Sequence, residues 1–323
     1  MWTAVVLGSF IAAMLGLYAG WAWHAVAHGA ALWPFVIGLP FAYLAFPFFF
    51  TCLWVTLGWW LRAPRPAEVA LTLPERLRLF RDEFASLAQS APRMVLYRLL
   101  MRDPPPAPAT LPVLLLHGVG CNAGVWTGLR GHLEREGLGP VYALSYGPPL
   151  APIEHFVPQV AEKIGQIAAA TGAARVVVVC HSMGGLVARA YLRRYGGAHV
   201  QRLVTIGTPH AGSLHAWMMR GQALADMRPR SEFLAAINAS ADHLDGVPAV
   251  SLWSWHDSMV TPQTSARVDW ADNVVLAGIA HNALLNDREV WRRVADEVRR
   301  ARADLAATSG SPASAARTPS VPA

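Results

Sequence analysis

Hydrophobic and polar residues are distributed very unevenly along the 323-residue chain. Residues 1–61 contain no Asp, Glu, Lys or Arg, and two long apolar runs at 4–26 and 33–61 are separated by a turn at His28 and Gly29. A helix of about 20 apolar residues crosses the hydrocarbon core of a membrane. The pattern therefore predicts a transmembrane hairpin. A cleaved signal peptide is the alternative, but it requires a basic start and a shorter apolar core.

An amphipathic region is predicted at 62–102, directly after the hairpin. Thr72 and Glu75 have the spacing of a capping box, which predicts a helix over 72–88 with apolar residues along one side. This helix either lies on anionic lipid headgroups or packs on the core as an ordinary domain helix. Prolines dominate residues 103–111, and this composition predicts a stiff linker to the next part of the chain.

Short β-branched runs alternate with helical patterns over residues 112–305, which is typical of a parallel sheet with crossover helices. The predicted strands lie at 113–116, 141–145, 175–179, 202–206, 247–253 and 273–277. The predicted helices lie at 153–170, 183–195 and 282–303. Apolar helical segments at about 211–246 predict a cap over one edge of the sheet, or else simple covering helices. Residues 306–323 are rich in Ser, Ala, Pro and Thr and are predicted to form a disordered tail.

One strand-to-helix junction carries a serine in a distinctive setting. The strand at 175–179 runs into the motif Cys-His-Ser-Met-Gly-Gly at 180–185 and then into a helix. This order is typical of a nucleophile elbow, where a sharp turn pushes the serine hydroxyl out above the sheet and requires small neighbours. Gly184 meets that requirement, and Cys180 replaces the usual glycine. The alternative is an ordinary helix N-cap, but the register of strand, motif and helix favours Ser182 as a nucleophile.

A serine nucleophile needs a histidine that accepts its proton and a carboxylate that orients the histidine. In this arrangement the acid and then the histidine follow later strands of the sheet. Asp257 follows the fifth predicted strand, and His281 follows the sixth. Asp245 and Asp272 precede their nearest strands, which puts them at the opposite edge of the sheet. Asp257 and His281 are therefore the predicted partners of the serine.

Two backbone N–H groups are needed for the negative charge that develops on the substrate oxygen. Met183, directly after the serine, offers one, and Val119 in the loop after the first strand offers the other. The loop around Val119 also resembles a loose dinucleotide-binding fingerprint. The strand that follows lacks the terminal acid of such a site, and no Cys/His spacing typical of a metal site is present. We therefore expect neither a cofactor nor a metal.

The net charge of +6 does not indicate nucleic-acid binding, because Lys163 is the only lysine and the arginines are scattered among acids. Basic residues do gather just after the hairpin, from Arg62 to Arg81, whereas the N-terminus and the turn at 28–33 have no Lys or Arg. This bias predicts that the N-terminus and the globular domain face the cytoplasm, with the hairpin in the inner membrane. Three cysteines without a pairing pattern agree with a reducing compartment.

Four motifs occur in the chain order of a known superfamily. They are Leu-His-Gly at 116–118, His-Ser-Met-Gly-Gly at 181–185, Gly-Thr-Pro-His-Ala-Gly-Ser at 207–213, and the loops that hold Asp257 and His281. With these motifs, residues from about 112 to 303 resemble the α/β-hydrolase superfamily, and within it the bacterial triacylglycerol lipases and esterases.

The resemblance implies an α/β-hydrolase fold, with a mostly parallel sheet of about six strands and a helical cap. It also implies ester hydrolysis through an acyl-serine, without an organic cofactor. Many secreted members of this group have a disulfide and a calcium-binding Asp two residues after the catalytic histidine. Here Ala283 occupies that position, so calcium binding and secretion are not carried over.

These patterns lead to the hypothesis of a membrane-anchored serine ester hydrolase that acts on acyl esters or lipids. Two alternatives stay open. One is an acyltransferase that uses the same residues, and the other is a catalytically inactive hydrolase fold that serves as a membrane interaction module. The patterns specify no oligomeric state. The predicted division of the chain is a hairpin at 1–61, amphipathic helices at 62–102, a linker at 103–111, a catalytic domain at 112–305 and a tail at 306–323.

Overall fold

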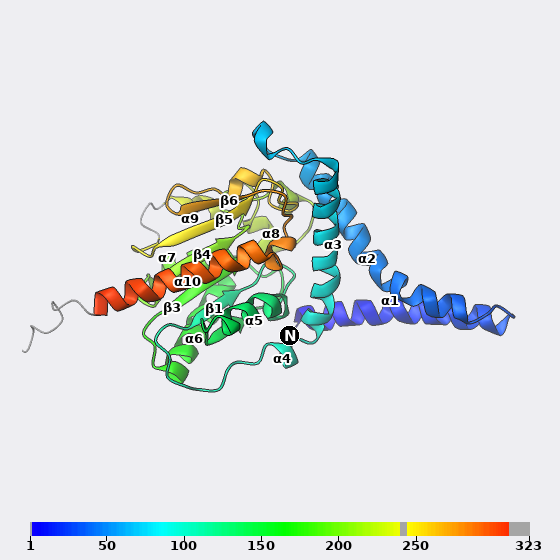
Figure 1. Ribbon diagram of the computed structural model, residues 1–323, viewed down its shortest axis with the longest axis horizontal. Helices are drawn as coiled ribbons and strands as arrows, with labels where there is room; N and C mark the ends of the chain where they lie inside the picture. The colour runs from blue at the N-terminus through cyan, green and yellow to red at the C-terminus, as the bar shows by residue number, and fades with distance from the viewer. Residues whose placement is uncertain (1, 240–243, 310–323) are drawn as a thin grey trace, which may run out of the picture.

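Six parallel strands form the central sheet, in the order β2-β1-β3-β4-β5-β6 (Figure 1). The computed structural model describes residues 2–239 and 244–309. β1, β3 and β4 are buried along their whole length, as expected for strands that crossover helices cover on both faces. The predicted six-stranded parallel sheet is confirmed. The strands are β1 (Val113–Leu116), β2 (Val141–Leu144), β3 (Val176–His181), β4 (Val200–Ile206), β5 (Ala249–Ser254) and β6 (Asp272–Leu276).

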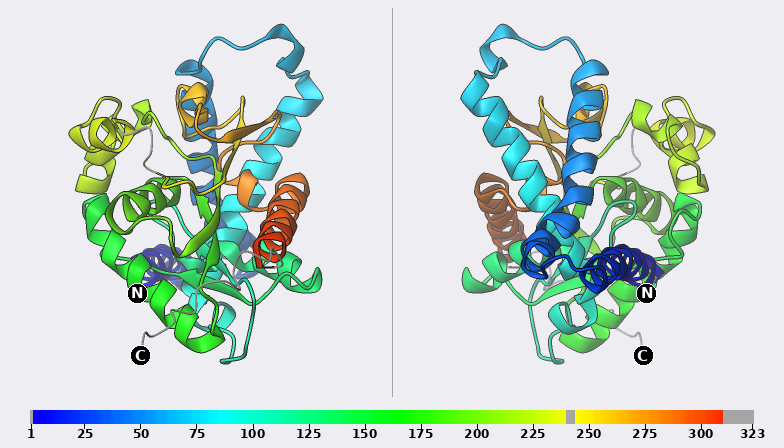
Figure 2. Two further views of the ribbon diagram at one scale, coloured as in Figure 1. Left: turned by 90° about the vertical axis from the view of Figure 1, so that its left-hand side faces the viewer. Right: turned by 90° about the vertical axis from the view of Figure 1, so that its right-hand side faces the viewer.

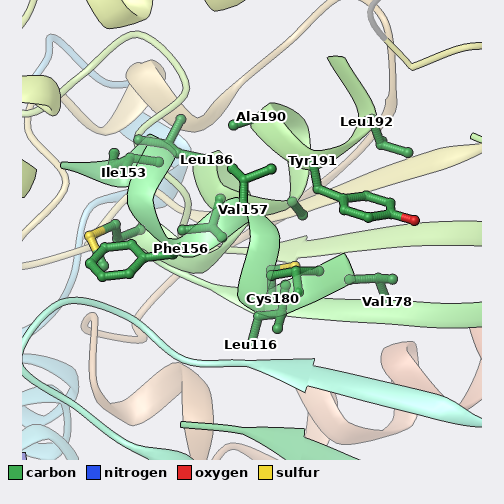
Figure 3. Close-up of a cluster of buried hydrophobic side chains, with 14 of the residues drawn as sticks. Leu116, Ile153, Phe156, Val157, Val178, Cys180, Leu186, Ala190, Tyr191 and Leu192 are labelled. Atoms are coloured by element: carbon green, nitrogen blue, oxygen red, sulfur yellow. The ribbon is translucent and has the colours of Figure 1, made fainter. Parts of the chain in front are cut away.

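One face of the sheet is covered by α6 (Ile153–Thr171) and α7 (Met183–Tyr195). Figure 3 shows the side chains that these helices and the strands contribute to a continuous apolar cluster, among them Phe156 of α6 and Leu186 of α7. Cys180 at the end of β3 lies in the same cluster. The burial of these side chains supplies the main driving force that holds the two helices on the sheet.

The opposite face is covered by α5 (Thr127–Arg135) and α10 (Arg288–Ser309), so the sheet lies between two helical layers (Figure 2). α10 begins at Arg288, and the predicted start at 282 was wrong. Asp287 caps the helix, because its Oδ1 accepts hydrogen bonds from the N–H groups of Glu289 at 2.8 Å and Val290 at 3.1 Å. The residues before this cap form a loop and the short helix η5 (Ala283–Leu285) instead. α10 extends to Ser309, and the rest of the predicted tail lies outside the described residues.

The segment predicted as a cap joins β4 to β5, and its described residues form three short helices. They are η3 (Leu214–Trp217), α8 (Gln222–Asp226) and α9 (Glu232–Asn238). Asp226 accepts a hydrogen bond from the N–H of Ile153 at 2.8 Å, which ties α8 to the start of α6. Other short helices are η2 (Ala123–Trp126), before α5, and η4 (Gln263–Ala266), after β5.

Two apolar helices precede the globular part, α1 (Trp2–Ala27) and α2 (Trp33–Trp60). Both are long and apolar enough to cross a membrane, and many of their large apolar side chains are exposed. They meet at the turn and diverge toward the globular part, where the second half of α2 runs beside α3 (Figure 1). Pro40 and Pro47 lie within α2, where the missing N–H groups allow a bend. The predicted pair of apolar helices is confirmed.

α3 (Leu73–Val95) runs beside α2 and packs on the globular part at η2 and η5. The predicted capping box between Thr72 and Glu75 is present. The helix ends seven residues beyond the predicted boundary at 88. Its Phe80 and Phe84 contact Phe48 of α2 edge-to-face, at ring-centroid distances of 5.7 and 6.1 Å. α3 therefore packs as a domain helix on both sides.

A proline-rich segment connects α3 to the sheet. The short helices η1 (Ala67–Val69) and α4 (Tyr97–Leu100) flank α3, and residues 101–112 then lead to β1 without regular structure. Asp103 forms an ion pair with Lys163 of α6 at 2.5 Å, and the N–H of Ala109 donates to the carbonyl of Thr171 at 3.1 Å. The segment is thus fastened along the surface of α6.

Candidate active site

Ser182 lies on the sharp turn between β3 and α7. Its φ of 55° and ψ of −128° belong to a region that residues with a side chain rarely adopt, so the turn is strained. Close packing around the turn leaves no room for larger neighbours. A Cβ added to Gly184 would lie 2.7 Å from the carbonyl oxygen of His117, and one added to Gly185 would lie 2.6 Å from Cγ2 of Thr208. The local sequence therefore forces the elbow geometry.

Asp257 and His281 come together in the loops that follow β5 and β6. His281 Nδ1 lies 2.9 Å from Asp257 Oδ2, and each residue is 3% exposed. The second carboxylate oxygen, Oδ1, accepts hydrogen bonds from the N–H groups of Met259 at 2.8 Å and Val260 at 2.7 Å. The loop amides therefore hold the carboxylate while its free oxygen orients the imidazole.

The protonation of His281 follows from this environment. Burial alone lowers the pKa of His281, but the charge and hydrogen bond of Asp257 together with the nearby Glu83 carboxylate outweigh it. The net effect raises the pKa of His281 above 6.5. His281 is thus a stronger base than a free histidine, and its imidazolium form is stabilised by two carboxylates.

Ser182 and the Asp257–His281 pair lie at the same edge of the sheet, after the carboxyl ends of β3, β5 and β6. The ring of His181, next to the serine, lies 4.6 Å from the ring of His281, and its Nε2 donates to the His281 carbonyl at 3.1 Å. Gly207 after β4 lies against the Asp257–His281 pair. A Cβ at this position would lie 3.1 Å from Asp257 Oδ2, so a larger residue would crowd the carboxylate. None of the hydrogen bonds found among the described residues involves the Ser182 hydroxyl. Such contacts often tighten only when substrate is bound.

The two predicted oxyanion donors flank Ser182. Met183 is the first residue of α7, where the backbone N–H has no acceptor within the helix. Val119 lies in a turn closed by a hydrogen bond from the N–H of Cys121 to the carbonyl of Gly118 at 3.3 Å. That turn approaches the serine closely, since a Cβ on Gly118 would lie 2.9 Å from Ser182 Cβ. The structure therefore brings the loop of Val119 next to the nucleophile.

Tyr146 fixes the loop that carries Val119. Its hydroxyl donates to the carbonyl of His117, and its ring stacks on the imidazole of His117 at a centroid distance of 4.1 Å. Burial lowers the pKa of His117 to about 4, so this histidine is neutral near pH 7. His117 is therefore a scaffold residue of the loop and not a second base.

Glu83 of α3 is a component of this region that the sequence did not suggest. It is fully buried, although it comes from a helix outside the sheet and its two covering layers. Its carboxylate contacts Ser258 and Asn282, the residues that directly follow Asp257 and His281. The only sequence signal for it is an acid on the same side of α3 as Leu79 and Ser86, which are also buried.

Comparison with known proteins agrees with the topology. Residues 144–280 match a family described as PGAP1-like alpha/beta domain, and this segment includes Ser182 and Asp257 and ends one residue before His281. The mature lipase BlEst2 of Bacillus licheniformis is similar in structure, with a TM-score of 0.54 and 18% identity, over 61% of this chain and 96% of that one. Lipase B of Aspergillus fumigatus gives a TM-score of 0.52 and 20% identity, over 58% of this chain and 52% of that one. The chain has the α/β-hydrolase fold.

The α/β-hydrolase fold confirms the resemblance that the sequence motifs predicted. At 18–20% identity the similarity establishes the fold, whereas the chemistry has to rest on the residues of the site. No group of three His, Cys, Asp or Glu residues suited to a metal ion occurs in residues 2–239 and 244–309.

The cap contacts both the loop after Asp257 and the apolar helix α2. His215 of η3 lies near the loop after Asp257, with its Nδ1 2.9 Å from the carbonyl of Met259. On its other side the His215 ring packs edge-to-face on Trp54 of α2, at 4.9 Å. Trp217 and Met218, at the end of η3, are 61% and 50% exposed. The outer surface of the cap thus presents apolar side chains.

Proposed function

We propose that this protein is a membrane-anchored serine hydrolase that cleaves acyl esters through an acyl-serine intermediate. Ser182 is the nucleophile, His281 the general base, and Asp257 the acid that orients the base. One observation carries the proposal. A serine in a strained elbow, φ 55°, lies at the same sheet edge as a buried carboxylate–imidazole pair whose Nδ1 and Oδ2 atoms are 2.9 Å apart.

The chemistry follows the order expected for such a site. His281 Nε2 takes the proton of the Ser182 hydroxyl while Oγ forms a bond to the carbonyl carbon of the ester. The oxygen of that carbonyl becomes negative and accepts hydrogen bonds from the N–H groups of Met183 and Val119. The ester C–O bond then breaks, and the alcohol leaves with the proton from His281. Water, activated by the same histidine, releases the acid and restores the serine.

A membrane location is supported by the N-terminal helices. α1 and α2 have the length and hydropathy of membrane spans, and Arg62 stacks on Trp59 at 4.5 Å where α2 ends. Aromatic residues at the interface followed by basic residues are typical of the cytoplasmic end of a span. We therefore propose two spans in the inner membrane, with the catalytic domain in the cytoplasm and acyl chains of membrane lipids as the substrate class. The apolar cap surface around Trp217 suits such chains.

The hydrolase proposal is tested with the full-length protein and the variant Ser182→Ala. Release of free acid from a soluble short-chain ester should be reduced to near background in the variant, because the residual catalysis of such sites comes only from binding and the oxyanion donors. Product analysis with an added alcohol provides a further outcome. Transfer of the acyl group to the alcohol in preference to water would assign the protein to the acyltransferases instead.

The membrane proposal is tested separately with long-chain lipids in anionic vesicles. Turnover of the vesicle lipid by the full-length protein, reduced to near background in Ser182→Ala, supports the substrate class. Turnover of the short ester alone would mean that the hairpin serves only to localise the protein. The proposed roles of Ser182, Asp257 and His281 would be unchanged. A reporter fused to the C-terminus that is active only in the periplasm would contradict the proposed topology.

A further inference from the structure

The carboxylate of Glu83 bridges the two loops that carry the acid and the base of the candidate site. Its Oε1 accepts hydrogen bonds from the Ser258 hydroxyl at 2.9 Å and from the Asn282 side-chain amide at 2.8 Å. Its Oε2 accepts from the backbone N–H of Ala283 at 2.8 Å. A single side chain from α3 is therefore bound to the loop after β5 and to the loop after β6.

These contacts continue directly to the base. The Ser258 hydroxyl, which donates to Glu83, also lies 3.3 Å from the backbone N–H of His281 and accepts a hydrogen bond from it. Ser258 directly follows Asp257, so this residue links the loop after β5 to the loop after β6. The distance between the Asp257 carboxylate and the His281 ring thus depends on a group outside both loops.

The donors around Glu83 match an ionised carboxylate. A carboxylate anion only accepts hydrogen bonds, and all three partners donate. A charged group that is buried without compensation destabilises a fold strongly, so a fully buried acid needs partners that stabilise its charge. Burial raises the pKa of Glu83, while the three donors and the neighbouring His281 lower it in part.

We propose that Glu83 is a positioning residue, through which α3 holds the loops of Asp257 and His281 at hydrogen-bonding distance and keeps a negative charge beside the imidazole. This inference rests on the proposed function. Glu83 acts through Ser258, Asn282 and the Ala283 amide and touches no reacting atom. The helix that follows the membrane hairpin is therefore part of the active-site framework.

Glu83→Gln is the most direct test, because the amide keeps the size but replaces one acceptor with a donor and removes the charge. We expect kcat to fall by about 10- to 100-fold, since a displacement of catalytic groups by about 1 Å costs up to that much. KM for a short soluble ester should change little. The matched control is Asp82→Asn, which removes the charge of the adjacent carboxylate on the outer side of α3, where it forms an ion pair with exposed Arg81. The control should retain wild-type kcat.

A second readout separates positioning from a merely structural role. The groups that face His281 are Asp257, Glu83, His181 and His215, of which the two carboxylates raise its pKa and the histidines add no negative charge. Removing the Glu83 charge should lower the pKa of His281, which moves the acid limb of kcat/KM to lower pH. A histidine NMR titration of the full-length protein in detergent measures the same shift without turnover.

The outcomes discriminate between this inference and the proposed function. If wild-type protein hydrolyses no ester, the proposed function fails, and the NMR titration still decides whether Glu83 raises the pKa of His281. Wild-type kcat and an unmoved titration in Glu83→Gln overturn the inference alone. If that variant does not fold, Ser258→Ala keeps the carboxylate and removes the link to the His281 backbone. In this variant a lowered kcat at unchanged KM supports the inference, and unchanged kcat overturns it.

Discussion

Gly58 of α2 offers a sharp test of how closely the apolar hairpin is joined to the active site. It lies two residues before the end of an apolar helix, where a glycine usually has no special role, yet it is buried against the loop that follows Asp257. A Cβ at this position would lie 2.7 Å from the carbonyl oxygen of Ser258 and 2.8 Å from Ser258 Cα. Both atoms belong to the backbone, so no side-chain rotation relieves the contact.

The expected effect of Gly58→Ala follows from these distances. The loop has to retreat by about 0.7 Å to restore the 3.4 Å at which ordinary contacts begin. Gln263 transmits the shift, because its side-chain amide donates both to the Gly58 carbonyl at 3.3 Å and to the Asp257 carbonyl at 2.9 Å. A displacement of this size predicts that kcat decreases by roughly 10- to 100-fold.

The assay compares initial rates on a soluble short-chain ester for the full-length wild type and Gly58→Ala in detergent, together with thermal unfolding. Gly20→Ala in α1 is the matched control, because nothing lies within 4 Å of a Cβ at that position. Alanine favours a helix over glycine by about 1 kcal/mol, so a weaker helix cannot explain a loss. Equal rates for wild type and Gly58→Ala would refute the argument that α2 supports the acid loop.

Three further predictions concern the site and its surroundings. Asp257→Asn should lower kcat by about 10⁴-fold, the loss known for the equivalent substitution in a serine protease, since the imidazole is left in the wrong tautomer; activity near wild type would reassign the acid. Burial lowers the pKa of His281 but the neighbouring carboxylates raise it overall, so the acid limb of kcat/KM should lie at a higher pH than the pKa of a free histidine; an acid limb at or below that pKa contradicts this. Arg202→Ala removes the buried one of two arginines that pair with Glu297 at 2.8 Å, the exposed Arg300 being the other, and should destabilise the fold by about 2 kcal/mol, the contribution of hydrogen bonds to a charged group. The exposed Arg293→Ala should cost less than about 1 kcal/mol, and similar melting temperatures for the two variants would contradict this prediction.

The strands and the elbow could be predicted because their signals are local. β-branched runs mark the strands, and the small residues on both sides of Ser182 reflect the steric demand of its turn. The observed ends of some elements differ from the predicted ones where a single residue changes the hydrogen bonding of the backbone. β5 begins at Ala249 and not at the predicted 247, since Pro248 has no N–H to donate to the sheet. α10 begins directly after Asp287, which caps it, and apolar periodicity does not detect such a cap.

The supports of the site could not be predicted, because they depend on contacts between distant parts of the chain. Glu83 reads in the sequence as one more acid on an amphipathic helix, and its partners Ser258 and Asn282 lie 175 and 199 residues away. Gly58 reads as a lipid-facing residue in an apolar run. Only the packing of α2 and α3 on the loops after β5 and β6 reveals that both positions are constrained.

Covalent labelling examines the role of Ser182 without any assumption about the substrate, because a fluorophosphonate reacts with a serine that is activated as a nucleophile. The full-length protein is treated with the reagent, digested, and the modified peptide identified by mass spectrometry. We expect one phosphonylated peptide, modified at Ser182, together with loss of ester hydrolysis and no labelling of Ser182→Ala. Equal labelling of wild type and Ser182→Ala, or modification of a different serine, would contradict this expectation.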